Sequence, residues 1–142
     1  MLTRRRFAGF ACCAICAATG FIATEAAAQG TPPLTVGTVT RTTLAQTDGP
    51  TPGYVTINIL TELEPNAALL RHTHPGIESA YVIEGGVELQ VKGQATQTLK
   101  AGDGWAVQPE TPHVLKNGDK KTKYAITFVV EKGKPLVSPA PE

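Results

Sequence analysis

Three short segments of the sequence place apolar side chains at every second position. These segments are Val55, Ile57 and Ile59; Val87, Leu89 and Val91; and Tyr124, Ile126, Phe128 and Val130. Because side chains along a strand alternate between its two faces, each segment is expected to be a strand with one buried face. Turn compositions such as Gly85-Gly86 and Asn117-Gly118-Asp119 separate the segments, and no stretch keeps a helical period. The pattern predicts an all-β fold, either a sandwich or a barrel.

Length and composition indicate one compact domain. The chain has 142 residues, of which 42% are hydrophobic and 18% are charged, and this balance favours a packed core over disorder. The formal charge is +1, and it becomes −1 without the first 28 residues, which contain three arginines and Glu25. A nearly neutral body has no electrostatic reason to bind nucleic acid or an anionic membrane. We therefore expect no nucleic-acid partner.

Residues 1–28 have the composition of an export signal. Arg4, Arg5 and Arg6 precede an apolar run over residues 7–23, and three alanines before Gln29 fit a cleavage site. The order Thr-Arg-Arg-Arg-Phe resembles a twin-arginine signal, which we favour over general secretory export. An uncleaved membrane anchor is the alternative, but the apolar run is short for a full span. The sequence predicts a periplasmic or secreted protein with no stable membrane association after cleavage.

The cysteines remove several kinds of chemistry from the mature protein. Cys12, Cys13 and Cys16 all lie within the predicted signal. The mature chain, residues 29–142, therefore has no disulfide, no thiolate nucleophile and no cysteine metal ligand. This is compatible with an oxidising compartment.

The three histidines of the chain carry its most specific chemical pattern. His72 and His74 are two residues apart in an expected strand, so both should point to the same face. Glu78 follows after the Pro75-Gly76 bend, and His113 lies where a later strand could return across the same cavity. Three imidazole nitrogens and one carboxylate oxygen suit one divalent transition metal ion, namely Fe(II), Mn(II), Ni(II), Cu(II) or Zn(II). Such a set leaves coordination positions open if the ion takes more than four ligands.

Two motifs of the sequence resemble those of the cupin superfamily. The first runs from Asn66 through His72-Thr73-His74 and Glu78 to Gly85, and it departs from the family pattern only at Asn66, where the family has glycine. The resemblance, closest to the small, quercetin-dioxygenase-like cupins of a single domain, implies a jelly-roll β-barrel. It also implies that His72, His74, Glu78 and His113 bind the metal.

The second motif departs from the family pattern at more positions. It leads from Gly102-Asp103 to His113 and then Asn117, with Gln108 in place of a proline and Glu110 in place of a glycine. We expect the loop before His113 to differ in shape while His113 and Asn117 keep their places. Asn117 itself is interpreted as a turn residue.

The motifs divide the chain into four parts. Residues 1–28 form the export signal, 29–53 an N-terminal extension, 54–131 the cupin domain, and 132–142 an extended tail. Leu34, Val36 and Val39 could form an additional strand that pairs at an edge, either of its own sheet or of another subunit. Together with the resemblance, this favours a homodimer.

Several other residues are candidates for roles near the metal. Trp105 and Phe128 are interpreted as core residues rather than as a substrate platform. The candidates for acid or base groups around the metal are Tyr54, Tyr81, Glu84, Gln108 and Glu110. From these and the ligand set we take Glu78, Glu84 and Tyr81 as the catalytic candidates.

Three functions are compatible with the sequence. The leading hypothesis, from the resemblance, is a mononuclear-metal oxygenase that acts on a small hydroxylated organic substrate. The second is a redox-neutral lyase, decarboxylase or isomerase, in which the metal acts as a Lewis acid and Glu84, Tyr81 or Glu110 transfers the proton. The third is a cupin that binds a small ligand without catalysis.

Overall fold

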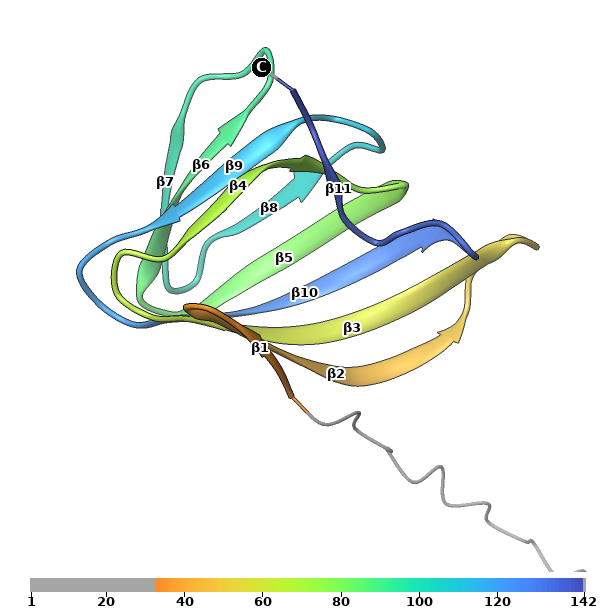
Figure 1. Ribbon diagram of the computed structural model, residues 1–142, viewed down its shortest axis with the longest axis horizontal. Coiled ribbons are helices and arrows are strands. Elements are labelled where there is room, and N and C mark those ends of the chain that lie inside the picture. The colour runs from red at the N-terminus through yellow and green to blue at the C-terminus, as the bar shows by residue number, and fades with distance from the viewer. Residues whose placement is uncertain (1–32, 142) are drawn as a thin grey trace, which may run out of the picture.

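The protein consists of two packed β-sheets. The computed structural model describes residues 33–141, and the predicted export signal lies outside them. Within this range all eleven elements are strands, and the two sheets contain six and five of them. The sheets face each other and diverge toward one end of the molecule (Figure 1). The predicted all-β class is confirmed.

The order of strands alternates between the two sheets. The six-stranded sheet contains, in spatial order, β1 (Leu34–Val36), β2 (Val39–Asp48), β3 (Tyr54–Leu63), β10 (Thr122–Glu131), β5 (Gly76–Glu84) and β8 (Gly104–Val107). The five-stranded sheet contains β11 (Ser138–Pro139), β4 (Ala68–Thr73), β9 (His113–Asn117), β6 (Gly86–Val91) and β7 (Gln97–Lys100). Most successive strands cross from one sheet to the other, as in a jelly roll. Within residues 33–141 the strand pairs form two separate sheets. No strand pair links one sheet to the other, so they do not close into one hydrogen-bonded barrel.

The alternating segments form the core between the sheets. Strand β10 is buried at every second residue, and its buried side chains include Tyr124, Ile126 and Phe128. Leu89 of β6, in the opposite sheet, is fully buried. Each fully buried side chain of this size stabilises the fold by about 1.5–3 kcal/mol. The apolar residues that alternate in the sequence thus lie on the face of each sheet that is turned toward the other sheet.

Strands β1 and β2 extend the six-stranded sheet at one edge. β1 pairs with β2, in which Arg41 is the partner of Leu34, and β2 pairs along its length with β3. The predicted edge strand therefore pairs within its own chain. Residues that we assigned to an N-terminal extension supply a ten-residue strand of the sheet.

The C-terminal segment links the two sheets. It leaves β10 in the six-stranded sheet and adds β11 beside β4 in the five-stranded sheet (Figure 1). Pro139 pairs with His72, so the tail lies directly against the histidine strand.

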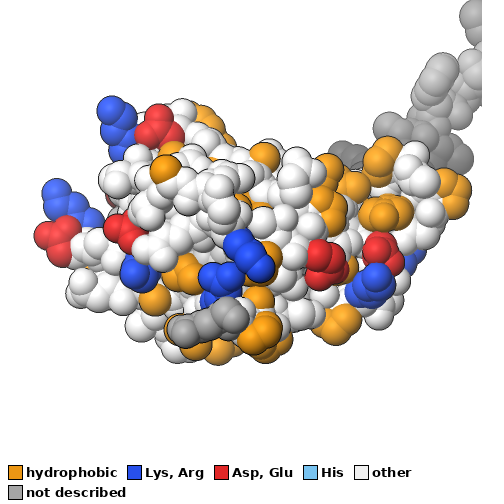
Figure 2. Space-filling model, turned by 90° about the horizontal axis from the view of Figure 1, so that it is seen from above, with side chains coloured by type: hydrophobic (Ala, Val, Ile, Leu, Met, Phe, Trp, Pro, Cys, Tyr) orange, Lys and Arg blue, Asp and Glu red, His pale blue; other side chains and the backbone are white. Residues whose placement is uncertain are grey.

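The visible surface has mixed charge. Acidic and basic side chains are interspersed on the face shown in Figure 2, neither forms a broad patch, and no histidine is visible there. Among the described residues, no helix has the length and apolar character needed to cross a membrane.

Candidate metal centre

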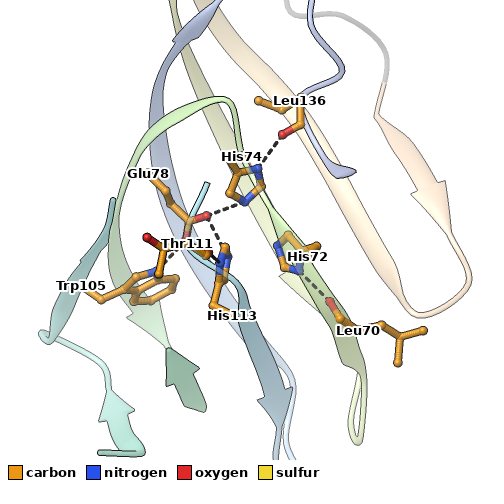
Figure 3. Close-up of polar contacts among 8 residues, drawn as sticks. All are labelled: Leu70, His72, His74, Glu78, Trp105, Thr111, His113 and Leu136. Atoms are coloured by element: carbon orange, nitrogen blue, oxygen red, sulfur yellow. Dashed lines mark hydrogen bonds and ion pairs between the residues drawn. The ribbon is translucent and has the colours of Figure 1, made fainter. Parts of the chain in front are cut away.

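Four buried side chains converge between the sheets. His72, His74, Glu78 and His113 each offer one ligand atom, and these atoms all lie within 4.8 Å of one another. The ring centroids of His72 and His113 are 4.2 Å apart, and those of His74 and His113 are 5.2 Å apart. The residues predicted as ligands are thus brought together from β4, β5 and β9 and the turn after β4 (Figure 3).

Strand pairing and one tight turn position these side chains. His72 of β4 is the direct partner of His113 of β9, so the two imidazoles lie side by side. The chain then turns at Pro75 and enters β5 at Gly76, where an added Cβ would collide with the backbone oxygen of Val129. Only glycine lets β5 approach β10 so closely, and this approach places Glu78 two residues later on the buried face.

A backbone carbonyl fixes the orientation of each histidine ring. Nδ1 of His72 lies 2.6 Å from the Leu70 oxygen, Nδ1 of His74 lies 2.6 Å from the Leu136 oxygen, and Nδ1 of His113 lies 3.0 Å from the Thr111 oxygen (Figure 3). A carbonyl oxygen only accepts hydrogen bonds, so each Nδ1 carries the proton. In the neutral rings the lone pair is therefore on Nε2, which is the atom that a metal would bind.

Glu78 presents one oxygen to the histidines and the other to a tryptophan. Oε2 of Glu78 lies 2.8 Å from Nε2 of His74 and 3.4 Å from Nε2 of His113. Oε1 accepts a 2.6 Å hydrogen bond from Nε1 of Trp105. Trp105 is buried, as expected, but its bond to Glu78 was not foreseen.

The contact between His74 and Glu78 requires a cation. Within residues 33–141, Nε2 of His74 is buried and makes no hydrogen bond, although Oε2 of Glu78 lies 2.8 Å away. With the His74 proton on Nδ1, this contact brings a lone pair against a carboxylate oxygen. Two acceptors at that distance repel unless a proton or a metal ion lies between them. The donor set therefore fits one divalent metal ion, held by three Nε2 atoms and one carboxylate oxygen.

The electrostatics of the cluster keep two ligands ready for metal. Burial raises the pKa of Glu78, but the contacts with His113 and His74 outweigh it and lower this pKa to about 2. Burial, and next the charge of His113, lower the pKa of His72 to about 4. Burial lowers the pKa of His113, but Glu78 and the Thr111 carbonyl outweigh burial and raise it. At neutral pH Glu78 is ionised and His72 is neutral, which are the states that bind metal.

The cluster lines a small cavity. The cavity has a volume of about 210 Å³ and is bounded by all four candidate ligands, by Arg41, Thr61 and Tyr124, and by the apolar side chains Leu34, Leu69, Leu115, Ile126, Phe128, Leu136 and Val137. Phe128 stands against His74, with ring centroids 4.7 Å apart. Phe128 therefore forms both core and cavity wall.

The remaining predicted catalytic residues lie outside this cavity. Tyr81 is on β5 but points to the face opposite Glu78, where 54% of it is exposed. Glu84 is exposed at the far end of β5. Tyr54, Gln108 and Glu110 do not line the cavity either. The structure does not bring Tyr81 or Glu84 to the histidines.

Two departures from the family motifs keep a glycine-like backbone. Asn66 has φ of 62° and Glu110 has φ of 54°, both in the left-handed region that glycine adopts readily. Glu110 stands where the family motif has a glycine, and its backbone lies in the region that glycine favours. Asn117 is more than a turn residue, because its buried side chain donates to the Glu64 and Lys120 carbonyls and accepts from Thr122.

Comparison with known families agrees with this geometry. The profile of the cupin domain family matches residues 59–134. The chain belongs to the cupin family. No curated protein matches this cupin in sequence.

Solved structures share the fold of this cupin at low sequence identity. An RmlC-like cupin from Shewanella frigidimarina has a TM-score of 0.62 and 21% identity over 74% of this chain and 87% of its own. The polyketide cyclase RemF from Streptomyces resistomycificus has a TM-score of 0.61 and 19% identity, over 74% and 72%. The DMSP lyase DddQ from Ruegeria pomeroyi has a TM-score of 0.58 and 15% identity, over 66% and 44%. These similarities show the fold.

Proposed function

We propose that this cupin is a mononuclear metal-dependent oxygenase that acts on a small hydroxylated organic substrate. The observation that carries the proposal is the convergence of three Nε2 lone pairs and one carboxylate oxygen at the wall of a cavity. A divalent metal bound there would supply Lewis-acid polarisation of a substrate oxygen and, if redox-active, reactivity toward dioxygen. The protein holds the ligands and shapes the cavity.

The proton-transfer groups of the cavity favour an oxygenase over a redox-neutral enzyme. Of the residues that line it, only Glu78 carries a carboxylate, and Trp105 and the histidines already engage both of its oxygens. Burial raises the pKa of Tyr124, so its hydroxyl is a poor base at neutral pH. A lyase or isomerase needs a positioned general base, and the lining offers no free one.

The cavity size supports a small substrate. Its volume of about 210 Å³ is below the roughly 300–1,000 Å³ of pockets that take drug-sized ligands. A molecule with a single ring or a short chain fits this volume better than a flavonol with several fused rings.

A redox-neutral reaction is the second candidate. The hydroxyls of Thr61 and Tyr124 and the guanidinium of Arg41 line the same cavity and could donate protons or hydrogen bonds. The structural relatives include proteins described as a lyase and a cyclase, which shows that the fold accommodates such reactions. In this case Tyr124 would replace Tyr81 and Glu84 as a hydrogen-bond or proton donor, not as a base.

Metal analysis and oxygen uptake test the proposal together. Elemental analysis of purified protein is expected to give one transition metal ion per chain, and less than a tenth of that, roughly, in His113→Ala and Glu78→Gln. The Fe(II)-loaded protein is then supplied with single-ring phenols and hydroxy acids in an oxygen electrode. Uptake with a matching product by mass spectrometry supports the oxygenase. Turnover under strict anaerobiosis supports the redox-neutral candidate, and stoichiometric binding without any product would identify a binding protein.

Export and dimer formation are further proposals. Residues 1–28 are proposed to direct the protein to the periplasm or outside the cell, and cell fractionation with N-terminal sequencing tests this. A homodimer is proposed for the mature protein, and light scattering that gives the mass of a single chain would refute it.

A further inference from the structure

The cavity has a polar end formed by three strands. Arg41 of β2 pairs directly with Thr61 of β3, and Thr61 pairs on its other side with Tyr124 of β10. Direct partners in neighbouring strands point to the same face of a sheet. All three side chains accordingly line the cavity that contains the metal ligands.

Arg41 is a cation without an acidic partner. Among residues 33–141, five lysines form ion pairs with carboxylates, whereas Arg41 forms none. Arg41 is only partly exposed and lines the cavity, so a ligand that fills the cavity would displace water from beside its side chain. Partial removal of a charge from water is unfavourable unless an opposite charge compensates it. The cavity therefore favours a ligand that brings a negative charge to Arg41.

Tyr124 adds a neutral donor beside this cation. Burial raises the pKa of Tyr124, and the positive charge of Arg41 offsets only part of this effect. The hydroxyl is consequently protonated at neutral pH and available as a donor. With Thr61 it complements the planar guanidinium fork, which matches the two oxygens of a carboxylate.

The polar end and Glu78 of the metal cluster lie at different positions along the six-stranded sheet. Glu78 is opposite Phe128 in β10, four residues along the strand from Tyr124. At about 3.3 Å per residue this is a separation of roughly 13 Å along the strand, shortened by the side chains that reach into the cavity. Ile126 lies between the two positions and is apolar, as is half of the cavity lining.

We propose that Arg41, assisted by the hydroxyls of Thr61 and Tyr124, binds the carboxylate of a small organic acid whose other end reaches the metal cluster. The inference deepens the function proposed above and rests on it for the role of the metal end. A single cation and a small cavity suit a monovalent carboxylate better than a phosphate dianion. The substrate class is then an acid with an apolar body and a second oxygen group opposite the carboxylate.

Binding of matched acids and amides tests this assignment. The mature protein is loaded with Zn(II), which is redox-inert, and titrated calorimetrically with 4-hydroxybenzoate, 3-(4-hydroxyphenyl)propionate and 4-hydroxybutyrate, each against its neutral amide. At least one acid is expected to bind about tenfold or more tightly than its amide, because the amide cannot form charge-assisted hydrogen bonds with Arg41. Arg41→Gln should reduce this preference to about twofold or less, and Arg41→Lys should keep part of it.

Control variants separate the proposed contact from general effects. Lys100→Gln removes the same charge from an exposed position on β7 and is expected to leave the preference unchanged. Thermal unfolding shows whether Arg41→Gln is folded, and Arg41→Lys provides the test if it is not. Equal binding of every acid and its amide, or an acid preference that survives in Arg41→Gln, would overturn the assignment.

The same set of proteins distinguishes this inference from the proposed function. If the acids bind through Arg41 but the Fe(II) protein turns over none of them, the carboxylate site stands and the oxygenase fails. If the Fe(II) protein turns over a substrate with the same KM in Arg41→Gln as in the wild type, the metal function stands and the carboxylate site fails.

Discussion

Trp105 donates its indole N–H to Oε1 of Glu78 at 2.6 Å. Trp105 lies on β8 opposite Ala80, so the bond runs diagonally between neighbouring strands. It occupies one carboxylate oxygen and leaves Oε2 to face His74 and His113. The tryptophan thus determines which oxygen of Glu78 is presented to a metal, and in which direction.

Trp105→Phe should weaken metal binding without unfolding the protein. Phenylalanine keeps most of the apolar contact but cannot donate to Glu78, so the carboxylate is free to rotate. Loss of such an outer contact typically lowers metal affinity about 10–100-fold. Competition with a chelating dye measures the affinity, and thermal unfolding monitors the fold. An affinity equal to that of the wild type would show that Glu78 is held by other contacts.

The metal-free protein should lose stability as the pH falls below about 6.5. The pKa of His72 is lowered from 6.5 to about 4 by burial and by His113, so between these values only the unfolded chain binds the proton. The free energy of unfolding therefore falls by about 1.4 kcal/mol per pH unit across this window of roughly 2.5 units, or about 3 kcal/mol overall.

Two neighbouring groups modify this pH profile. Glu78, whose pKa falls from 4.5 to about 2 through its histidine contacts in spite of burial, continues the loss below pH 4.5. The pKa of His113 is raised in the folded protein. Its contribution to stability is therefore fully present below pH 6.5 and is lost as the pH rises through the pKa of the folded state. Urea unfolding of chelator-treated protein at pH 4.5, 5.5 and 6.5 measures the profile. His72→Gln should flatten it, and an equally steep profile in that variant would contradict the assignment to His72.

Gly76→Ala should destabilise the protein and disturb the metal site together. The added Cβ would meet the backbone of Val129 and Val130, which cannot move aside as a flexible side chain can. Overpacking of this kind costs about 1–3 kcal/mol, and it displaces the start of the strand that carries Glu78. Gly118→Ala is the control, because no atom lies within 4 Å of an added Cβ there. Chemical unfolding and metal titration measure the two effects, and equal results for both variants would refute the close approach.

Glu110→Gly should stabilise the loop before His113. Glu110 has φ of 54°, and a residue other than glycine in this region carries strain of about 1 kcal/mol or more. Glycine removes the strain but adds freedom to the unfolded chain, so a net gain of about 0.5 kcal/mol is expected. Gln108→Gly, in the same loop without a positive φ, should instead lower the free energy of unfolding. A loss of stability in both variants would show that the Glu110 side chain makes a compensating contact.

The elements that follow from local pattern were predictable from the sequence. Alternation in residues 55–59, 87–91 and 124–130 gave the buried face of β3, β6 and β10, because side-chain parity in a strand depends on the sequence alone. The spacing of His72, His74 and Glu78 likewise needed only one strand and one turn. The four candidate ligands do converge.

Contacts that depend on which strands are neighbours were not predictable in this way. Trp105 reaches Glu78 only because β8 pairs with β5, and Arg41 lines the cavity only because β2 pairs with β3. Tyr81 illustrates the reverse case, since it is three residues from Glu78 and therefore faces the opposite side of the sheet. Counting alternate positions along the strand from Glu78 would have excluded Tyr81 as a residue of the metal site. No local signal in the sequence marks the Leu136 carbonyl as the acceptor for His74.

The bond between His74 and Leu136 has a consequence for biosynthesis. The residues it joins are 62 positions apart, so Leu136 is synthesised well after His74. While the C-terminal residues are still inside the ribosome, His74 lacks the acceptor that selects its metal-binding tautomer. We therefore expect full metal affinity only after synthesis has passed Leu136 and this bond has formed.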